Sequence, residues 1–309
     1  MTARFNVSTL THDEVAPPSA DNLRWDMAAL SAEEPLDDRS IAATAFAKRQ
    51  SAAQLQFKFS VATNTLFVNG QEASFGKLRA QLSGRTRVLI EATSLTYPEL
   101  LYLFAAATRE KVKTVTFLYV EPKGYRRPVD DRLCDHRNFN LSQNRRFRAI
   151  PMFMTNLSEI ETGQAVFFLG YEGARLGQAL QQEELLQAWK KHVVFGVPAF
   201  ESAWEIDAIA NNVDHLSAGD QVRYAAASSA SAAYRLLTEL RTADKEARPI
   251  LVAPLGTKPH AIGAALFLIE HDSMDQAVLL YDHPERSQGR TEEVRRWHLY
   301  EVTDTFLAT

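Results

Sequence analysis

The chain is poor in the residues and runs that mark several classes of protein. Its 309 residues include one cysteine, Cys134, so an intrachain disulfide is excluded, and no Cys/His spacing typical of a zinc site surrounds it. No stretch approaches the roughly 18 consecutive apolar residues of a membrane span, and the amino terminus lacks the apolar core of a signal peptide. We therefore expect a cytoplasmic protein without a membrane partner.

There is also no excess of positive charge. The sequence has 34 Lys and Arg against 38 Asp and Glu, a formal net charge of −4. Long nucleic acid is bound by neutralising many phosphates, so this balance argues against such a partner, although a local basic patch can still bind a small anion. The length suffices for one large domain or two ordinary ones with a substantial core.

Common catalytic and nucleotide-binding motifs are missing. The sequence contains no G-x-G-x-x-G, G-x-S-x-G or H-E-x-x-H pattern. The usual enzyme classes gain no support, and the question of catalysis stays open. We expect no cofactor and no metal site, because the acidic residues Glu201, Glu205 and Asp207 are best explained as a solvated helix surface.

Strands and helices alternate over most of the chain. Residues 1–54 have few β-branched runs and several proline and acidic pairs, which predicts an irregular or partly helical arm. Phe57–Val61 and Thr65–Val68 indicate a hairpin. Further strands are expected at 87–91, 114–120, 165–169, 192–197, 222–226, 250–253 and 277–281, and helices at 97–109, 178–189, 231–241 and 260–270. Continuous apolar strands around helices predict an α/β protein with Rossmann-like, mostly parallel sheets.

One pattern occurs twice. Residues 88–122 and 250–284 each hold an apolar strand, a loop that reaches a proline, an alanine-rich helix and a strand ending in Tyr-x-x-Pro, and the two tyrosines lie 162 positions apart. We expect two related βαβ halves, at 55–160 and 161–309, after the amino-terminal arm. The alternative is that any two βαβ units share apolar strands.

The sharpest local signal follows the predicted strand at 250–253. In Pro254–His260, Gly256 permits a close backbone approach, Thr257 offers a hydroxyl, and Lys258 places a cation just before a helix. Ligands of open α/β sheets bind outside the carboxyl ends of strands, where helix N-termini offer N–H donors. The spacing is not that of a Walker A loop. A plain strand-to-helix turn with a solvated lysine is the alternative.

Other residues after predicted strands complete the candidate site. Ligand-binding candidates beyond Gly256, Thr257 and Lys258 are Thr93, Ser94, Arg126, Arg127, His260 and Arg286. Candidates for acid/base catalysis are His260, Asp282 and His283. Helix capping also explains Thr93 and Ser94, and solvation also explains the arginines. Gly170–Gly173 predicts a tight turn that could bring backbone near a ligand, and Arg295–His298 predicts a loop in which cations alternate with aromatic residues.

The block Ile250–Asp282, little over a tenth of the chain, resembles part of the CARF domains. These CRISPR-associated Rossmann folds bind cyclic oligonucleotide second messengers and often carry a Thr-Gly-Gly-Thr-Lys run. Here the run is Pro254-Leu-Gly-Thr-Lys258, without the first threonine and the first glycine. The resemblance implies that Gly256, Thr257 and Lys258 contact the ligand. It also implies a role in prokaryotic defence, with the output in a protein effector partner.

We therefore predict a sensor or regulatory module for a nucleotide-type or other phosphorylated small ligand. One alternative is a hydrolase or transferase acting at the same strand ends. Another is a non-catalytic subunit of a larger assembly that docks through residues 1–54. The sequence leaves open the identity of the ligand and whether the chain forms a homo-oligomer.

Overall fold

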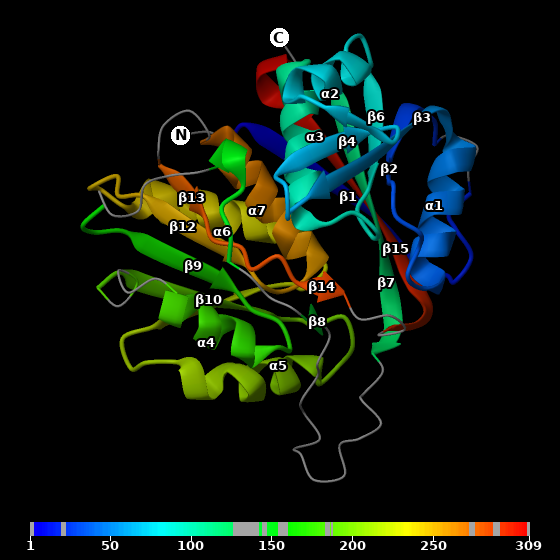
Figure 1. Ribbon diagram of the computed structural model, residues 1–309. Helices are drawn as coiled ribbons and strands as arrows, with labels where there is room; N and C mark the ends of the chain where they lie inside the picture. Colours follow the sequence, from blue (N-terminus) through cyan, green and yellow to red (C-terminus); the bar gives the residue numbers. More distant parts are fainter. Residues whose placement is uncertain are drawn as a thin grey trace. The chain divides into compact units, whose positions relative to one another are not determined.

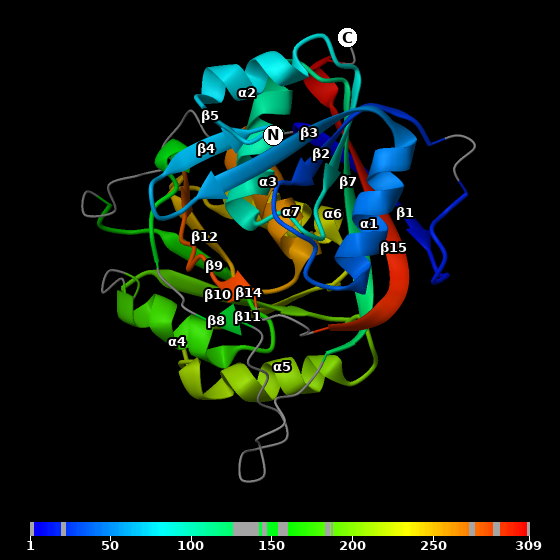
Figure 2. The same ribbon diagram turned by 45° about the vertical axis from the view of Figure 1, so that its right-hand side comes forward.

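A computed structural model describes residues 3–19, 23–125, 142–143, 147–153, 160–182, 186, 188–271, 276–286 and 291–307 (Figures 1 and 2). The chain divides into two compact units. Residues 127–287 form one, here called the parallel-sheet unit; residues 2–126 and 288–309 form the other, the mixed-sheet unit. The division differs from the expected halves at 55–160 and 161–309, because the last strand of the chain pairs with strands of the first 126 residues.

Five parallel strands form the sheet of the parallel-sheet unit. They are β9 (Gln164–Phe168), β10 (Lys190–Gly196), β11 (Gln221–Ala225), β12 (Ile250–Pro254) and β13 (Ala277–Leu279). Their order is β11-β10-β9-β12-β13, and every neighbouring pair is parallel. All residues of β9 and β12 are buried, as the inner strands of a parallel sheet covered on both faces require. The strands expected in this unit are confirmed to within two residues at each end.

Helices cover both faces of this sheet. In Figure 1, α4 (Gly173–Gln182) and α5 (Trp204–Asn212) lie below it, and α6 (Ala230–Ala243) and α7 (Lys258–Glu270) lie above it. The core under α4 and α5 includes Phe167, Val193 and Leu251. Helix α4 begins five residues before the expected start at 178 and ends well before 189. The short helices η1 (Pro151–Phe153) and η4 (Val213–His215) and the two-stranded sheet of β8 (Ser142–Gln143) and β14 (Glu285–Arg286) complete the unit.

Helices α6 and α7 touch through their backbones. A methyl group added at Gly263 of α7 would collide with the carbonyl oxygen of Ala230 and would lie 2.7 Å from the Cβ of Ala233, both in α6. Glycine therefore sets the distance between these helices, since any larger residue at this position would force them apart.

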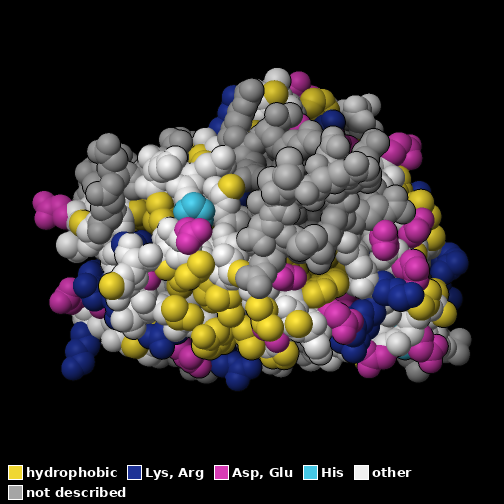
Figure 3. Space-filling view, turned by 90° about the horizontal axis from the view of Figure 1, so that it is seen from below, with side chains coloured by type: hydrophobic (Ala, Val, Ile, Leu, Met, Phe, Trp, Pro, Cys, Tyr) yellow, Lys and Arg dark blue, Asp and Glu magenta, His cyan; other side chains and the backbone are white. Residues whose placement is uncertain are grey.

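Exposed apolar residues gather on the side of α5. The register of β11 sets Val222 beside Val193 and Tyr224 beside Phe195, so these side chains point to the same face of the sheet as the core under α4 and α5. At the sheet edge they are 44% and 60% exposed, and Ile206 of α5 is 57% exposed. Figure 3 shows the hydrophobic side chains gathered on this face. Apolar surface in this unit thus continues onto its edge strand.

The mixed-sheet unit has a sheet of eight strands in the order β1-β15-β7-β6-β2-β3-β4-β5. The strands are β1 (Phe5–His12), β2 (Trp25–Ser31), β3 (Ser51–Ser60), β4 (Thr65–Val68), β5 (Gln71–Ala73), β6 (Arg87–Glu91), β7 (Thr114–Tyr125) and β15 (Thr291–Asp304). The neighbours β3, β2, β6 and β7 are parallel, and the outer pairs are antiparallel. The expectation of a mostly parallel sheet is wrong here, because hairpin strands extend one edge and β1 and β15 extend the other.

Three helices and the short η5 (Thr305–Leu307) belong to this unit: α1 (Asp38–Gln50), α2 (Phe75–Leu82) and α3 (Tyr97–Arg109). Helix α1 packs its Phe46 against Trp25 and Trp297 on one face of the sheet. On the other face Phe104 of α3 lies 5.5 Å from Phe117 of β7, between ring centroids. The unit is thus covered on both faces. The expected hairpin of β3 and β4 and the expected helix at 97–109 are confirmed.

The first 54 residues are not the irregular arm that we expected. They supply β1, β2, α1 and the start of β3. Strand β2 has alanine and methionine where a β-branched run would mark a strand, and its buried position between β3 and β6 decides its structure. Helix α1 begins at a reciprocal cap, in which the carboxylate of Asp37 accepts from the backbone N–H of Ser40 and the Ser40 hydroxyl accepts from that of Asp37.

The two segments that resemble each other in sequence form βαβ units of the same local geometry. In both β6-α3-β7 and β12-α7-β13, paired residues lie 27 positions apart, as in Ile90 with Phe117 and Val252 with Leu279. Each helix has 13 residues, a threonine as its N-cap and a proline in its first turn. In the part of the chain that the structure describes, no helix combines the length and the hydropathy that crossing a membrane requires.

Candidate functional site

The candidate site lies at the carboxyl edge of the parallel-sheet unit, where the direction of the chain across the sheet reverses. From β9 the chain proceeds outward to β10 and β11, then returns to β12 on the other side of β9 and continues to β13. The loops after β9 and β12 therefore leave neighbouring strands toward opposite faces (Figure 1). In open α/β sheets, ligands bind at such a reversal.

The loops after β9 and β12 are in backbone contact. A methyl group at Gly256 would lie 2.6 Å from the carbonyl oxygen of Leu169, and one at Gly170 would lie 3.3 Å from the Cα of Gly256. The sequence suggested that the missing side chain at Gly256 leaves room for a ligand. In the structure that room is occupied by the backbone of Leu169 in the loop after β9. The glycine is thus needed for the two loops to pack against each other.

Thr257 joins the start of α7 to the loop that follows β11, the edge strand of the sheet. Its hydroxyl accepts from the backbone N–H of His260, as an N-cap, and donates to the carbonyl oxygen of Ala227 at 2.8 Å. Helix α7 then begins at Lys258, with no acidic residue in its first turn. The positive end of the helix dipole is therefore accompanied by a cation and by no carboxylate of its own helix, which favours an anionic ligand.

A buried ion pair connects α4 with the loops that follow β12 and β13, near the start of α7. Arg175 of α4 donates from Nε and Nη2 to both carboxylate oxygens of Asp282, at 2.7 and 2.6 Å, and from Nη1 to the carbonyl oxygen of Leu255 at 2.5 Å. Burial alone would lower the pKa of Arg175, but the charge and hydrogen bonds of Asp282 outweigh it and raise that pKa above its ordinary value. Asp282 is fully buried, so its carboxylate is committed to holding the loops.

The two candidate histidines also have protein partners. The buried imidazole of His260 donates from Nε2 to the carbonyl oxygen of Ala226 at 3.0 Å and packs on Phe168. Burial lowers the pKa of His260 to about 4, so the ring is neutral at pH 7. His283 donates to the carbonyl oxygen of Arg148 at 2.9 Å, and burial lowers its pKa as well. Both rings are positioned as structural donors.

Sequence reasoning missed three residues that build this edge. Arg175 sits in the helical run that follows Gly173, and one arginine among buried alanine and leucine positions was the available signal. Asn211 and Asn212, at the end of α5, donate from their side chains to the carbonyl oxygens of Tyr171 and Gly170 at 2.8 and 2.9 Å. They hold the turn after β9, and no local pattern marks them.

No family model matches the chain, and no curated protein matches it.

The corresponding loop of the mixed-sheet unit is closed to anions by its own carboxylate. Glu91, fully buried at the end of β6, accepts from the backbone N–H of Thr93 at 2.7 Å and from that of Ser94 at 3.1 Å. Burial raises the pKa of Glu91, against the effect of these hydrogen bonds. The Thr93 hydroxyl accepts from the backbone N–H of Val120. The residue that matches Glu91 in the repeat is Ala253 of β12, which has no such carboxylate.

The candidate residues thus divide between the two units. Gly256, Thr257, Lys258, His260 and Asp282 come together at the carboxyl edge of one sheet, and His283 follows directly. Thr93 and Ser94 lie in the mixed-sheet unit. Arg286 belongs to β14, whose backbone pairs with β8. Arg126 and Arg127 lie outside the described residues, as does Cys134. Among the residues that the structure describes, no three His, Cys, Asp or Glu side chains form a metal-binding group.

Proposed function

We propose that the parallel-sheet unit is a Rossmann-like sensor module that binds a small anionic ligand of the nucleotide type at the carboxyl ends of β9 and β12. The observation that carries the proposal is the start of α7. It offers Lys258 and the positive end of a helix dipole, and it lacks the buried carboxylate that occupies the matching loop of the mixed-sheet unit.

The strand order supports the Rossmann-like assignment. Numbered within the unit, it is 3-2-1-4-5, and the reversal falls between strands 1 and 4, where dinucleotides bind in that fold. Gly256 and Thr257 lie between β12 and α7, and Lys258 is the first residue of that helix; the resemblance to CARF domains rests on this run. By the same resemblance, the ligand is a cyclic oligonucleotide, and the output passes to a protein effector in a defence system.

The geometry favours binding over acid/base catalysis for the candidates named from the sequence. Asp282 is paired with Arg175, and His260 is neutral and donates to a backbone carbonyl. We infer that these residues hold the loops in place while Lys258 and the first turn of α7 contact the ligand. The local match of the two βαβ units further supports a common origin of these two segments.

A thermal-shift titration tests this function. Purified protein is heated with inorganic pyrophosphate, mononucleotides, cyclic dinucleotides and cyclic oligoadenylates, and a ligand that prefers the folded state stabilises it by about 2.7 kcal/mol at 100 times its Kd. Lys258→Ala should weaken the binding about tenfold. The matched control is Lys245→Ala, an exposed lysine that follows the carboxyl end of α6. A panel without any shift, or a shift that Lys258→Ala leaves unchanged, contradicts the proposal.

A further inference from the structure

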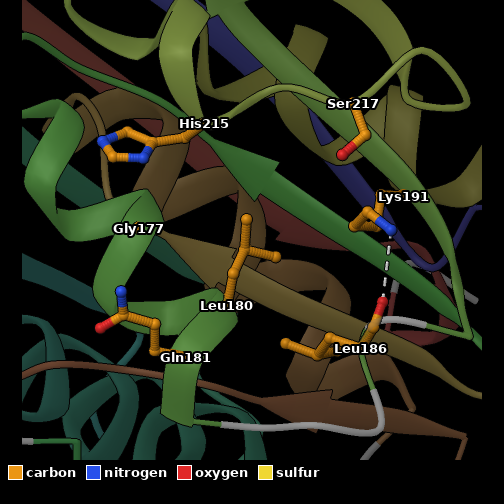
Figure 4. A pocket seen from close by; sticks show the side chains of 7 residues that line it. All are labelled: Gly177, Leu180, Gln181, Leu186, Lys191, His215 and Ser217. Carbon is orange, nitrogen blue, oxygen red and sulfur yellow. Dashed lines mark hydrogen bonds between the residues drawn. The ribbon is translucent and has the colours of Figure 1, made fainter.

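A hollow opens at the amino edge of the same parallel sheet, opposite the edge of the candidate site. Strand β10 starts there, and α4 and η4 end there. The hollow has a volume of about 670 Å³, within the range of small-molecule sites (Figure 4). Its lining includes Gly177, Leu180, Leu186, Lys191, His215 and Ser217, all within the parallel-sheet unit.

The imidazole of His215 depends on the absence of a side chain at Gly177. The ring lies against α4, and a methyl group at Gly177 would be only 2.8 Å from its Cε1. Figure 4 shows the ring at one side of the hollow, beside the helix that carries Gly177. The sequence of α4 therefore leaves space for this histidine at the edge of the hollow.

On the opposite side the ammonium of Lys191 makes two long contacts with the protein. Its Nζ donates to the carbonyl oxygen of Leu186 at 3.4 Å and lies 3.6 Å from the carboxylate of Asp220. Both distances are long, and an ammonium has three donors. Asp220 is nearly buried and also accepts from the backbone N–H of Ser217 at 2.8 Å. One cation that is partly balanced by one carboxylate suits a singly charged ligand better than a polyphosphate.

Two aliphatic side chains lie between these polar groups, and Gln181 of α4 adds a further polar side chain to the lining. In Figure 4 the side chains of Leu180 and Leu186 point toward the space between His215 and Lys191, and the hydroxyl of Ser217 points into the same space. A ligand here would contact the aliphatic carbons of the two leucines and the polar groups of Lys191 and Ser217. Small-molecule sites share this composition, in which a few polar groups orient a ligand and the apolar wall supplies contact area.

We propose that this hollow binds a small aliphatic monocarboxylate. The carboxylate accepts from Lys191 and Ser217, while the hydrocarbon body rests on Leu180 and Leu186 and extends toward the imidazole of His215. The site shares no residue with the proposed nucleotide site and lies at the other edge of the sheet, so each proposal stands or fails without the other.

The test titrates hexanoate into the full-length protein labelled on its histidine rings, with the His215 signal assigned by His215→Gln. The expected result is a saturable shift of that signal with a Kd on the order of 1 mM. Hexylammonium and inorganic phosphate at the same concentrations should leave the signal in place. A shift that does not saturate, or an equal response to hexylammonium, overturns the proposal.

Two variants and one control locate the site. Lys191→Met should weaken hexanoate binding at least tenfold, and Leu180→Phe, which fills the hollow, should abolish it without removing a charge. Lys190→Met is the matched control, because Lys190 is the exposed neighbour and does not line the hollow. Should Lys191→Met fail to fold, the Leu180→Phe variant decides. Unchanged binding in Leu180→Phe, or equal losses in the Lys190 and Lys191 variants, refutes the site.

Discussion

The ion pair beneath the candidate site makes a strong quantitative prediction. Arg175→Met leaves the fully buried carboxylate of Asp282 without its cation and the carbonyl oxygen of Leu255 without its side-chain donor. Breaking a buried pair by removing one partner costs about 3–5 kcal/mol, and we take about 4 kcal/mol as the expected loss in the free energy of unfolding. With a urea dependence of about 2 kcal/mol per molar, the unfolding midpoint of this unit falls by roughly 2 M.

The assay must identify which unit loses stability. Urea unfolding gives the midpoint, and amide hydrogen exchange resolved by peptide assigns the loss to residues 127–287. The matched control is Arg235→Met, an exposed arginine on α6, which we expect to change stability by less than about 0.5 kcal/mol.

A double variant separates the pair from general damage to the loops. Replacing both charges by apolar residues, as in Arg175→Met with Asp282→Leu, is often neutral in a buried site, so the double variant should regain most of the lost stability. A loss below about 1 kcal/mol in Arg175→Met would show that the ion pair does not stabilise these loops. A double variant that is no more stable than Arg175→Met would refute the same role of the pair.

Three further predictions follow from the same unit. Gly173→Ala should cost about 2 kcal/mol or more in urea unfolding because its Cβ would collide with the carbonyl oxygen of Asn211, whereas Gly219→Ala, in open space, should be nearly neutral. Since the pKa of His260 is about 4 when folded and about 6.5 when unfolded, its unfolded form takes up the proton first, and stability should fall by roughly 3 kcal/mol between pH 6.5 and 4. His260→Gln should flatten that slope, and an unchanged slope would contradict it. Thr257→Ala should lose about 1–2 kcal/mol of thermal stability and Thr257→Ser should retain most of it; equal losses would rule out the hydroxyl's two hydrogen bonds.

The local parts of the fold were predictable from sequence, and its long-range pairings were not. Apolar runs such as Ile250–Ala253 predict buried strands because burial on both faces leaves no polar side. Arg295–His298 was expected in a loop but lies within β15, where Trp297 and His298 face opposite sides of the sheet and only pairing with β1 and β7 makes the segment a strand. That pairing joins the two ends of the chain, and no local pattern encodes it.

The same limit applies to the candidate site. Gly256, Thr257 and Lys258 form one local run, so sequence could bring them together. The partner of Asp282 lies 107 positions away in α4, and the carbonyl that accepts from Thr257 lies 30 positions away, so both contacts depend on the topology of the sheet. The sequence has Glu91 in one strand-end loop and Ala253 at the matching position of the other, but only the structure shows that the Glu91 carboxylate accepts from the backbone of its own loop.

The backbone contact at Gly263 makes α6 and α7 a single mechanical element. The contact is made by backbone atoms of α6 and the Cβ of Ala233, none of which can change rotamer, so we expect α7 to carry α6 along when it moves at this point. Under the proposed binding at Lys258, a displacement of the start of α7 would therefore also move α6. A fluorophore attached there, for instance at Arg235→Cys, would report an event at the far end of the neighbouring helix.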